Sequence, residues 1–284
     1  MSEDKEKLVS PTKSIDDGKK NLYTVEPYRW VALVAFILCS FANGNTYVFF
    51  SSIMTKTING FKVPVVMILM CTVLYGWIYP ISSLLLANYI IGKYSANISL
   101  ILGGGCVVLY CWVRGMIVYS FPIVLIGAVL GAIGQPLILN CIPIIATKWF
   151  GIDQRALATT LASLANPVGN SFGLLWPALF VKSFFPYDIK RESLNAVIFL
   201  GILCTICVAF CWIFFRERPK RPPSPSAEQK SNVNVFKSMA QLLKSWNFVK
   251  LLLCYVCICI CNQLFSTIVN MQLNSFGFGK PVCF

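Results

Sequence analysis

Seven long apolar stretches divide this sequence and constrain its fold more than any other feature. Each is longer than the roughly 20 residues that an α-helix needs to cross a lipid bilayer. Their apolar residues surround every face of the expected helices, which distinguishes membrane spans from amphipathic surface helices. The sequence predicts transmembrane helices at Trp30–Ile53, Val63–Ile91, Ile98–Tyr119, Pro122–Ala146, Ala156–Val181, Leu194–Phe215 and Phe248–Leu273.

The composition of the 284 residues excludes most other classes of protein. Hydrophobic residues make up 57% and charged residues 12%, whereas about a quarter of a soluble domain is charged. A soluble globular domain, a disordered chain and a disulfide-stapled secreted fold are therefore excluded. No succession of short alternating strands predicts a β-barrel, so we expect an all-α membrane protein. With no histidine, catalytic triads, metal sites and proton relays that need this residue are excluded.

Two polar segments divide the chain into units. The first 29 residues carry six basic and six acidic side chains, which predicts a disordered tail without a signal peptide. Residues 216–246 are rich in Pro, Ser and charge, as is typical of a flexible linker. The expected organisation is a tail at 1–29, a six-helix bundle at 30–215, an interdomain linker at 216–246, a seventh transmembrane helix at 247–273 and a short tail at 274–284.

The distribution of basic residues predicts the orientation of the chain in the bilayer. If the N-terminus is cytosolic, seventeen Lys and Arg residues lie on the cytosolic side and seven on the other. Positive residues favour the cytosol, so we expect a cytosolic tail and linker and a non-cytosolic end at 274–284. The net charge of +13 thus reflects membrane topology, and we expect no nucleic-acid partner. Whether the membrane is the plasma membrane or an internal one stays open.

Thirteen cysteines include two pairs at Cys-x-x-Cys spacing, Cys204 with Cys207 and Cys254 with Cys257. In a helix this spacing places two small side chains on one face. No histidine or acidic partner accompanies them, so packing is a better interpretation than metal binding. We expect no metal site and no cofactor.

Polar side chains inside the predicted spans indicate a binding site, because they are costly in hydrocarbon. They gather at Asn43–Tyr47 in the first span, at Gln135 and Asn140 in the fourth, at Asn166–Asn170 in the fifth and at Asn262–Asn270 in the seventh. Neighbouring Gly and Pro residues predict loosened helices whose free backbone groups line a cavity. The concentration in the first, fourth and seventh spans predicts one shared cavity. The alternative is that each amide only bridges two helices.

Two further features of the spans concern packing and charge. Small residues at steps of three and four in the fifth span predict a packing face that could slide during a conformational cycle, at Ala158, Ala162, Gly169 and Gly173. Arg114 is the only charge well inside a span. Its side chain either snorkels to the interface or acts as a gating residue or charge contact with a solute.

Several motifs resemble those of one family of membrane carriers. The most specific pair is Trp149-Phe150-Gly151 with Asn166-Pro-x-Gly169, within a run that begins at Gly134. Weaker matches extend over nearly the whole chain beyond the tail: Tyr28-Arg-Trp30, Leu102-Gly-Gly-Gly105, Trp112-Val-Arg114 and Ser266-Thr267 with Asn270. The sequence is identified as a member of the feline leukaemia virus subgroup C receptor-related family, which belongs to the major facilitator superfamily.

The resemblance implies twelve helices in two six-helix halves, a central solute site near the midplane of the bilayer, and alternating access. This chain stops after the seventh span. It is therefore similar to an N-terminal half followed by the interdomain loop and the first helix of the second half. We expect the lipid bilayer, a small-molecule solute, and a second half-transporter or the missing C-terminal helices as its partners.

The resemblance also suggests which residues contact the solute. Choline carriers of the family place a Trp in the first span and a Tyr in the seventh around the ammonium group, and the matching positions here are Tyr47 and Gln263. Tyr47 can supply one aromatic wall, but Gln263 cannot supply the other. Gln135 matches a position that presents a polar side chain to the solute. We expect the same cavity to include Asn43, Asn140 and Asn270.

The expected solute is a small organic molecule such as a choline-like cation. Heme, which is also associated with the family, lacks its commonest axial ligand here because the chain has no histidine. A seven-helix receptor is an alternative, although the cytosolic N-terminus and the lack of Asp-Arg-Tyr and Asn-Pro-x-x-Tyr motifs oppose it. A non-transporting partner or regulatory isoform is another. No constellation of acid, base and nucleophile is visible, so we expect no enzyme and no catalytic residues.

Overall fold

The computed structural model describes residues 26–182, 185–219, 223 and 241–275, apart from the side chains of residues 262, 263 and 266–275. Every regular element in these ranges is helical, as the sequence predicts. The elements are α2 (Arg29–Tyr47), α3 (Phe49–Ser52), α4 (Met54–Phe61), α5 (Val65–Ser82), the π-helix η1 (Ser83–Ala87), α6 (Asn88–Lys93), α7 (Ala96–Val113), the 3-10 helix η2 (Arg114–Val118), α8 (Phe121–Leu139), α9 (Ile142–Trp149), α10 (Ile152–Phe180), α11 (Pro186–Phe214) and α14 (Trp246–Ser275). The predicted tails and linker lie mostly outside the described residues.

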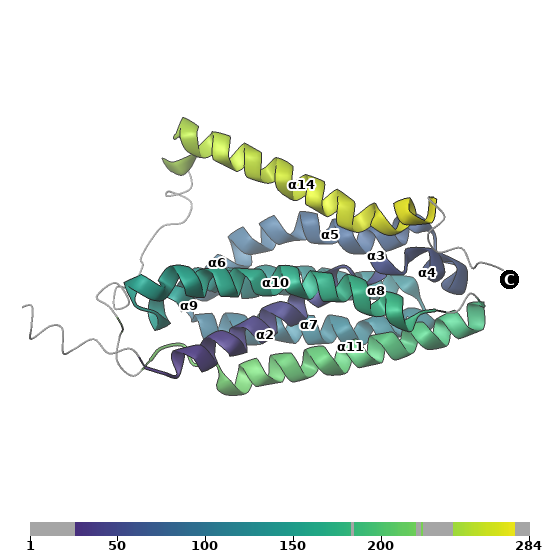
Figure 1. Cartoon of the computed structure of the whole chain (residues 1–284), viewed down its shortest axis with the longest axis horizontal. Coiled ribbons are helices and arrows are strands. Elements are labelled where there is room, and N and C mark those ends of the chain that lie inside the picture. Colours follow the sequence, from purple (N-terminus) through teal and green to yellow (C-terminus); the bar gives the residue numbers. More distant parts are fainter. Residues whose placement is uncertain (1–25, 183–184, 220–222, 224–240, 276–284) are drawn as a thin grey trace, which may run out of the picture.

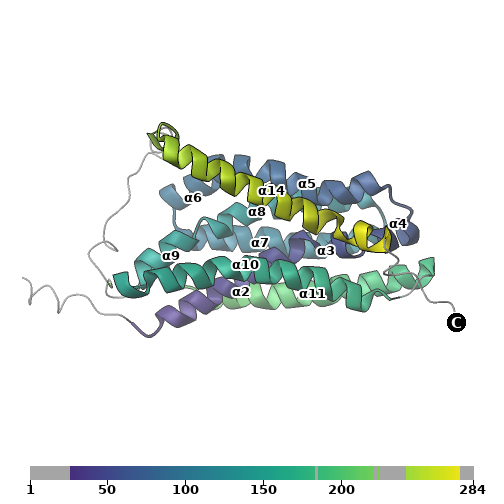
Figure 2. The same ribbon diagram turned by 45° about the horizontal axis from the view of Figure 1, so that its top comes forward.

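Most of the helices run along a common axis and form a bundle (Figures 1 and 2). α2 occupies the middle, where it packs against α10 and α11 and also touches α7 and α8. Leu33 and Phe36 of α2 join Val107 of α7 and Val208 of α11 in the largest apolar cluster, and all four are buried. A helix that is surrounded on so many sides is well placed to build an internal site.

The predicted spans are all occupied by helices, but not all of these helices are strongly apolar. Five segments of the described chain are long and apolar enough to cross a membrane: Arg29–Tyr47, Val65–Lys93, Ala96–Val118, Phe121–Trp149 and Pro186–Phe214. The other two predicted spans are also helices, but they are not among these five. The exceptions are α10, whose 29 residues include Asn166, Asn170 and several hydroxyl side chains, and α14, whose shorter apolar part is Trp246–Cys261.

The small residues of α10 pack against α2 of the same bundle. A Cβ atom on Gly169 would collide with the backbone carbonyl of Phe41, and one on Gly44 with that of Asn166. The two backbones therefore cross at a distance that only glycine permits. The face expected to slide during a conformational cycle is thus covered by α2. Its four predicted members are all buried: Ala158, Ala162, Gly169 and Gly173.

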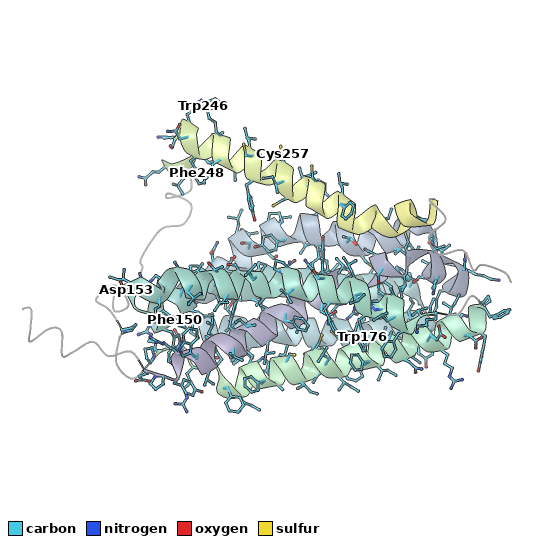
Figure 3. The ribbon with its side chains drawn as sticks, viewed as in Figure 1. Phe150, Asp153, Trp176, Trp246, Phe248 and Cys257 are labelled. Carbon is cyan, nitrogen blue, oxygen red and sulfur yellow. The ribbon has the colours of Figure 1, made fainter. Side chains whose placement is uncertain are left out.

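α14 crosses the bundle obliquely and contacts α3 and α4 (Figure 1). Its first half, which carries Trp246, Phe248 and Cys257, stands away from the other helices (Figure 3). Leu251 and Ile258 are 70% and 67% exposed. A helix that is apolar on all sides needs lipid or further helices around it. The exposed surface of this part of α14 is available for such contacts.

Candidate functional site

The first predicted span is broken directly after Tyr47, where α2 ends and α3 begins two residues later. Val48, with φ −104° and ψ 6°, lies in the sparsely populated bridge region. Hydroxyl groups on both sides bond back to the chain: Thr46 Oγ1 donates to the carbonyl of Asn43 (2.7 Å), and Ser52 Oγ donates to that of Phe49 (2.9 Å). Such bonds compete with the helical ladder and bend helices. The local sequence thus favours a break at this position.

Tyr47 belongs to a row of three tyrosines that come from three helices. Its ring lies edge to face against Tyr75 of α5, with 4.9 Å between centroids, and Tyr75 lies 6.3 Å from Tyr110 of α7. Tyr75 and Tyr110 are buried, whereas Tyr47 is partly exposed. The Tyr47 ring is therefore the accessible end of this tyrosine row.

Several buried polar atoms of α2 and its neighbours have no hydrogen-bond partner within the described part of the chain. They include Ser40 Oγ, both polar side-chain atoms of Asn43 and of Asn45, and Asn170 Oδ1. Leaving such a group unpaired costs about 1–3 kcal/mol. Buried polar groups are nearly always bonded, so unpaired ones call for water, an ion or a ligand. These atoms supply the donors and acceptors that a polar solute needs.

Two of these unpaired polar side chains and the ring of Tyr47 lie on one face of α2. Ser40, Asn43 and Tyr47 recur at steps of three and four residues, which aligns them along the helix. α10 meets the same region, because Asn166 Nδ2 donates to the carbonyl of Ser40 at 3.4 Å. Ser40 and Asn170 were not singled out by sequence reasoning as solute contacts. Only their unpaired state in the fold distinguishes them from other polar residues of the spans.

α8 closes the other side of this region. Gly131 packs so closely on Tyr75 that a Cβ atom there would collide with the tyrosine hydroxyl. Gln135 lies one turn further along the same face of α8 and is partly exposed. Tyr47 and Asn43 thus lie one turn apart on α2, and Gln135 lies on the face of α8 that meets Tyr75.

The other amides predicted to contact the solute do not extend this group of residues. Asn140 Nδ2 donates to Ser83 Oγ at 3.0 Å, beside the gap between α8 and α9. Its amide bridges two helices, which is the structural alternative that the sequence left open. The side chains of Gln263 and Asn270 lie outside the described residues.

Arg114 is completely buried at the start of η2, so its side chain does not snorkel to an interface. Its Cζ atom lies 4.7 Å from the ring centroid of Phe49 and 5.0 Å from that of Tyr110. Nη1 donates to the carbonyl of Thr46 at 3.5 Å, and Nη2 donates to Cys111 Sγ at 3.3 Å. Aromatic faces attract a guanidinium most strongly where water is excluded. The charge is thus held by rings, a carbonyl and a thiol.

The arrangement of cysteines favours packing. Across the described ranges, no group of three or more His, Cys, Asp or Glu side chains is placed to hold a metal ion. Cys204 is buried, and its thiol donates to the carbonyl of Ala42 at 3.8 Å. Cys207 is buried in the same apolar cluster.

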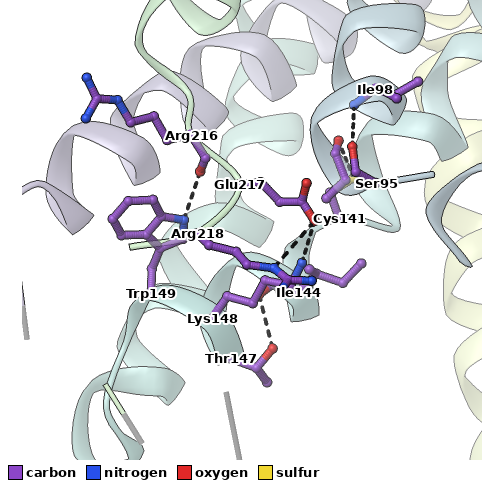
Figure 4. Close-up of polar contacts among 11 residues, drawn as sticks. Ser95, Ile98, Cys141, Ile144, Thr147, Lys148, Trp149, Arg216, Glu217 and Arg218 are labelled. Carbon is purple, nitrogen blue, oxygen red and sulfur yellow. Dashed lines mark hydrogen bonds and ion pairs between the residues drawn. The ribbon is translucent and has the colours of Figure 1, made fainter. Parts of the chain in front are cut away.

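At the end of the bundle where α2 begins, the first residues after α11 are bonded to the last turn of α9 (Figure 4). Lys148 Nζ pairs with Glu217 Oε1 at 2.8 Å, and Trp149 Nε1 donates to the carbonyl of Arg216 at 3.1 Å. The Arg216 guanidinium lies 4.8 Å from the ring centroid of Tyr28. We call these five residues the linker clamp. From the sequence only Tyr28 and Trp149 stood out, as parts of motifs.

The other end of the bundle is tied together by Lys56 of α4. Its ammonium donates to the carbonyl of Val181, and the backbone N–H of Lys182 donates to Glu192 Oε2 at 2.8 Å. Burial lowers the pKa of Lys56, and the charge of Glu192 opposes this shift. These contacts join α4 to the ends of α10 and α11.

The sequence over most of its length matches one protein family. The profile of the Major Facilitator Superfamily matches residues 32–282, which is most of the chain. The chain belongs to the major facilitator superfamily. This membership supports a multi-pass helical membrane protein and leaves the seven-helix receptor alternative without support.

Among relatives in this superfamily, the choline/ethanolamine transporter FLVCR2 of Rattus norvegicus is 25% identical over 266 residues, which cover 91% of this chain and 48% of the relative. The choline/ethanolamine transporter FLVCR1 of Felis catus is 25% identical over 264 residues, 89% of this chain and 47% of the relative. The uncharacterized MFS-type transporter C09D4.1 of Caenorhabditis elegans is 28% identical over 240 residues, 80% of this chain and 40% of the relative. The resemblance drawn from the motifs is confirmed.

The chain spans about half the length of the relatives it matches. These relatives are transporters and not enzymes, in line with the expectation for this superfamily member. What they carry is a property of the whole relatives, and it becomes a proposal for this chain.

Proposed function

We propose that this chain is the solute-binding half of a membrane transporter that moves a small organic solute, such as a choline-like cation, by alternating access. The observation that carries the proposal is the accessible ring of Tyr47 at a helix break, one turn from the unpaired amide of Asn43. Discontinuous helices commonly form the substrate sites of secondary transporters. Two of the relatives are choline/ethanolamine transporters, and this supplies the candidate solute.

The chemistry of the site suits a small alcohol that carries an ammonium group. The face of Tyr47 attracts a cation, with an energy of about 0.5–2 kcal/mol depending on desolvation. Asn43 and Gln135 provide amide oxygens and N–H groups that can bond the hydroxyl of such a solute. Tyr47 forms one wall only, so a second wall has to come from other helices. α14 is one candidate, because its exposed side chains include Tyr255 and Phe265.

Alternating access needs a second unit against which this half can move. We propose that further helices, in the same polypeptide or in a second one, provide it. The excess of Lys and Arg at the end that holds Tyr28 and the linker supports a cytosolic N-terminus. Surface labelling of an N-terminal epitope tag on unpermeabilised cells would contradict this orientation.

Substitution of Tyr47 tests the proposal. We expect Tyr47→Ala to weaken equilibrium binding of radiolabelled choline to the purified chain by roughly fivefold, the loss of about 1 kcal/mol of cation–π attraction. Tyr47→Trp should tighten binding, because tryptophan is the best cation–π partner. Cys207→Ala, in the apolar core of α11, is the matched control and should leave the dissociation constant unchanged.

Uptake into proteoliposomes separates a transporter from a partner protein. If the chain alone accumulates choline, a non-transporting role is excluded. If it binds choline but does not accumulate it, the chain is a binding half that needs additional helices. If neither Tyr47 variant changes choline binding, the site proposed here is wrong.

A further inference from the structure

We propose that Arg114 is a positioning residue for the solute site, because it holds the break in α2 and thereby fixes the Tyr47 ring. The inference rests on the proposed function for its consequence in binding. Its structural part stands on contacts of the fold alone.

The guanidinium of Arg114 touches the chain on both sides of the break. Nη1 bonds the carbonyl of Thr46, the residue directly before Tyr47. Cζ stacks over Phe49, the first residue of the next helix. The irregular backbone at Val48 lies between these two contacts. A single rigid, planar group therefore bridges α2 and α3 at the point where the helical ladder is interrupted.

A second set of contacts leads from Arg114 to Tyr47 through the tyrosine row. The guanidinium lies against Tyr110, Tyr110 is near Tyr75, and Tyr75 meets Tyr47 edge to face. The bond from Nη2 to Cys111 Sγ anchors the same group to α7. Both the backbone and the ring of Tyr47 thus depend on where Arg114 lies.

The charge of Arg114 has no acidic partner in this part of the sequence, since no Asp or Glu occurs between Glu26 and Asp153. A buried positive charge by itself repels a cationic solute. Removal of the charge alone would therefore strengthen the binding of choline. Removal of a positioning group would weaken it. Whether the dissociation constant for choline falls or rises when Arg114 is replaced therefore distinguishes the two roles.

The first experiment measures equilibrium binding of radiolabelled choline to the purified chain. We expect Arg114→Met to raise the dissociation constant by roughly fivefold, as much as the loss of the Tyr47 ring itself. Arg114→Lys, which keeps a donor and a cation near Thr46, should rescue binding to within about 1.5-fold of the parent chain. Arg191→Met, which removes an exposed arginine from α11, is the matched control and should have no effect. Tighter or unchanged binding in Arg114→Met would overturn the inference.

A double-mutant cycle tests whether Arg114 acts through Tyr47. If it does, Arg114→Met added to Tyr47→Ala should change the dissociation constant less than twofold beyond Tyr47→Ala alone. Fully additive effects would mean that Arg114 acts independently of this ring and would reject the proposed route.

Hydrogen exchange provides a readout without any solute. We expect Arg114→Met to accelerate exchange of the backbone amides of residues 47–54 at least tenfold, with α11 unchanged. Unchanged exchange at the break, or an equal acceleration in all helices, would contradict the positioning role. If the parent chain does not bind choline but the break loosens as expected, the choline proposal fails while the structural part of the inference survives.

Discussion

At the scale of single residues, the amides of α2 and α8 differ in how the fold satisfies them. Asn43 is 1% exposed and both of its polar side-chain atoms are unpaired among the described residues, whereas Asn140 donates to Ser83. In the sequence the two look alike, because each is an amide inside an apolar span. Only packing decides which one is left with free bonding capacity.

This difference leads to opposite effects of one substitution. We expect Asn43→Leu to raise thermal stability, because it removes a buried amide whose cost is about 1–3 kcal/mol, and to weaken choline binding. Asn140→Leu is the matched control and should lower stability, because it leaves the Ser83 hydroxyl without this partner. Thermal unfolding in detergent and equilibrium binding measure the two effects. A loss of stability in Asn43→Leu would show that the amide is satisfied in the native protein.

Arg114 marks the limit of sequence reasoning at this scale. Its position in an apolar span predicted either an interfacial or an internal side chain. Full burial between Phe49 and Tyr110 is the observed outcome. The choice depends on the rotation of α7 and on the break in α2, and neither is encoded by the residues around Arg114 alone.

At the scale of helices, apolarity predicts where the helices lie but not where they are interrupted. The predicted spans coincide with helices throughout, because a bilayer requires helical hydrogen bonding of every apolar stretch. The gap after Tyr47 depends on hydroxyl groups that bond back to the chain, and such bonds are present at many uninterrupted positions as well, including Thr159 and Ser171 of α10. Long-range contacts, such as those of Arg114, therefore contribute to where the helix breaks.

The close crossing of α2 and α10 is a second feature at the scale of helices. It can be tested by the addition of a single Cβ atom. We expect Gly169→Ala to destabilise the protein by about 1–3 kcal/mol, because the added Cβ meets the backbone carbonyl of Phe41, which cannot move aside as a side chain could. Gly76→Ala in α5 is the control, since its Cβ would enter open space and should be neutral or stabilising by about 0.5–1 kcal/mol. Equal melting temperatures of the two variants would contradict the close crossing.

At the scale of the whole molecule, the linker clamp joins the start of α2, the last turn of α9 and the first residues after α11. The segment that leads to α14 is thus fixed at its beginning to the bundle that holds the candidate site. In a transporter of two moving halves, such an attachment determines how movement of one half is passed to the linker. Movement can pass to the linker only while the contacts of the clamp hold.

Exchange of the two charges of the clamp tests its strength. Lys148 and Glu217 are about a quarter exposed, with side-chain values of 21% and 28%, and pairs of this kind contribute roughly 0.2–1 kcal/mol. Glu217→Lys should therefore open the clamp and accelerate cleavage after Arg216 by an arginine-specific protease, by about fivefold for each 1.0 kcal/mol lost. The double exchange, Lys148→Glu with Glu217→Lys, restores the attraction and should slow cleavage relative to Glu217→Lys, which has the same sequence around Arg216. Equally rapid cleavage in the double variant would contradict a clamp held by the attraction of these two charges. It would mean that the Trp149 bond and the stacking of Arg216 on Tyr28 depend on the original carboxylate of Glu217.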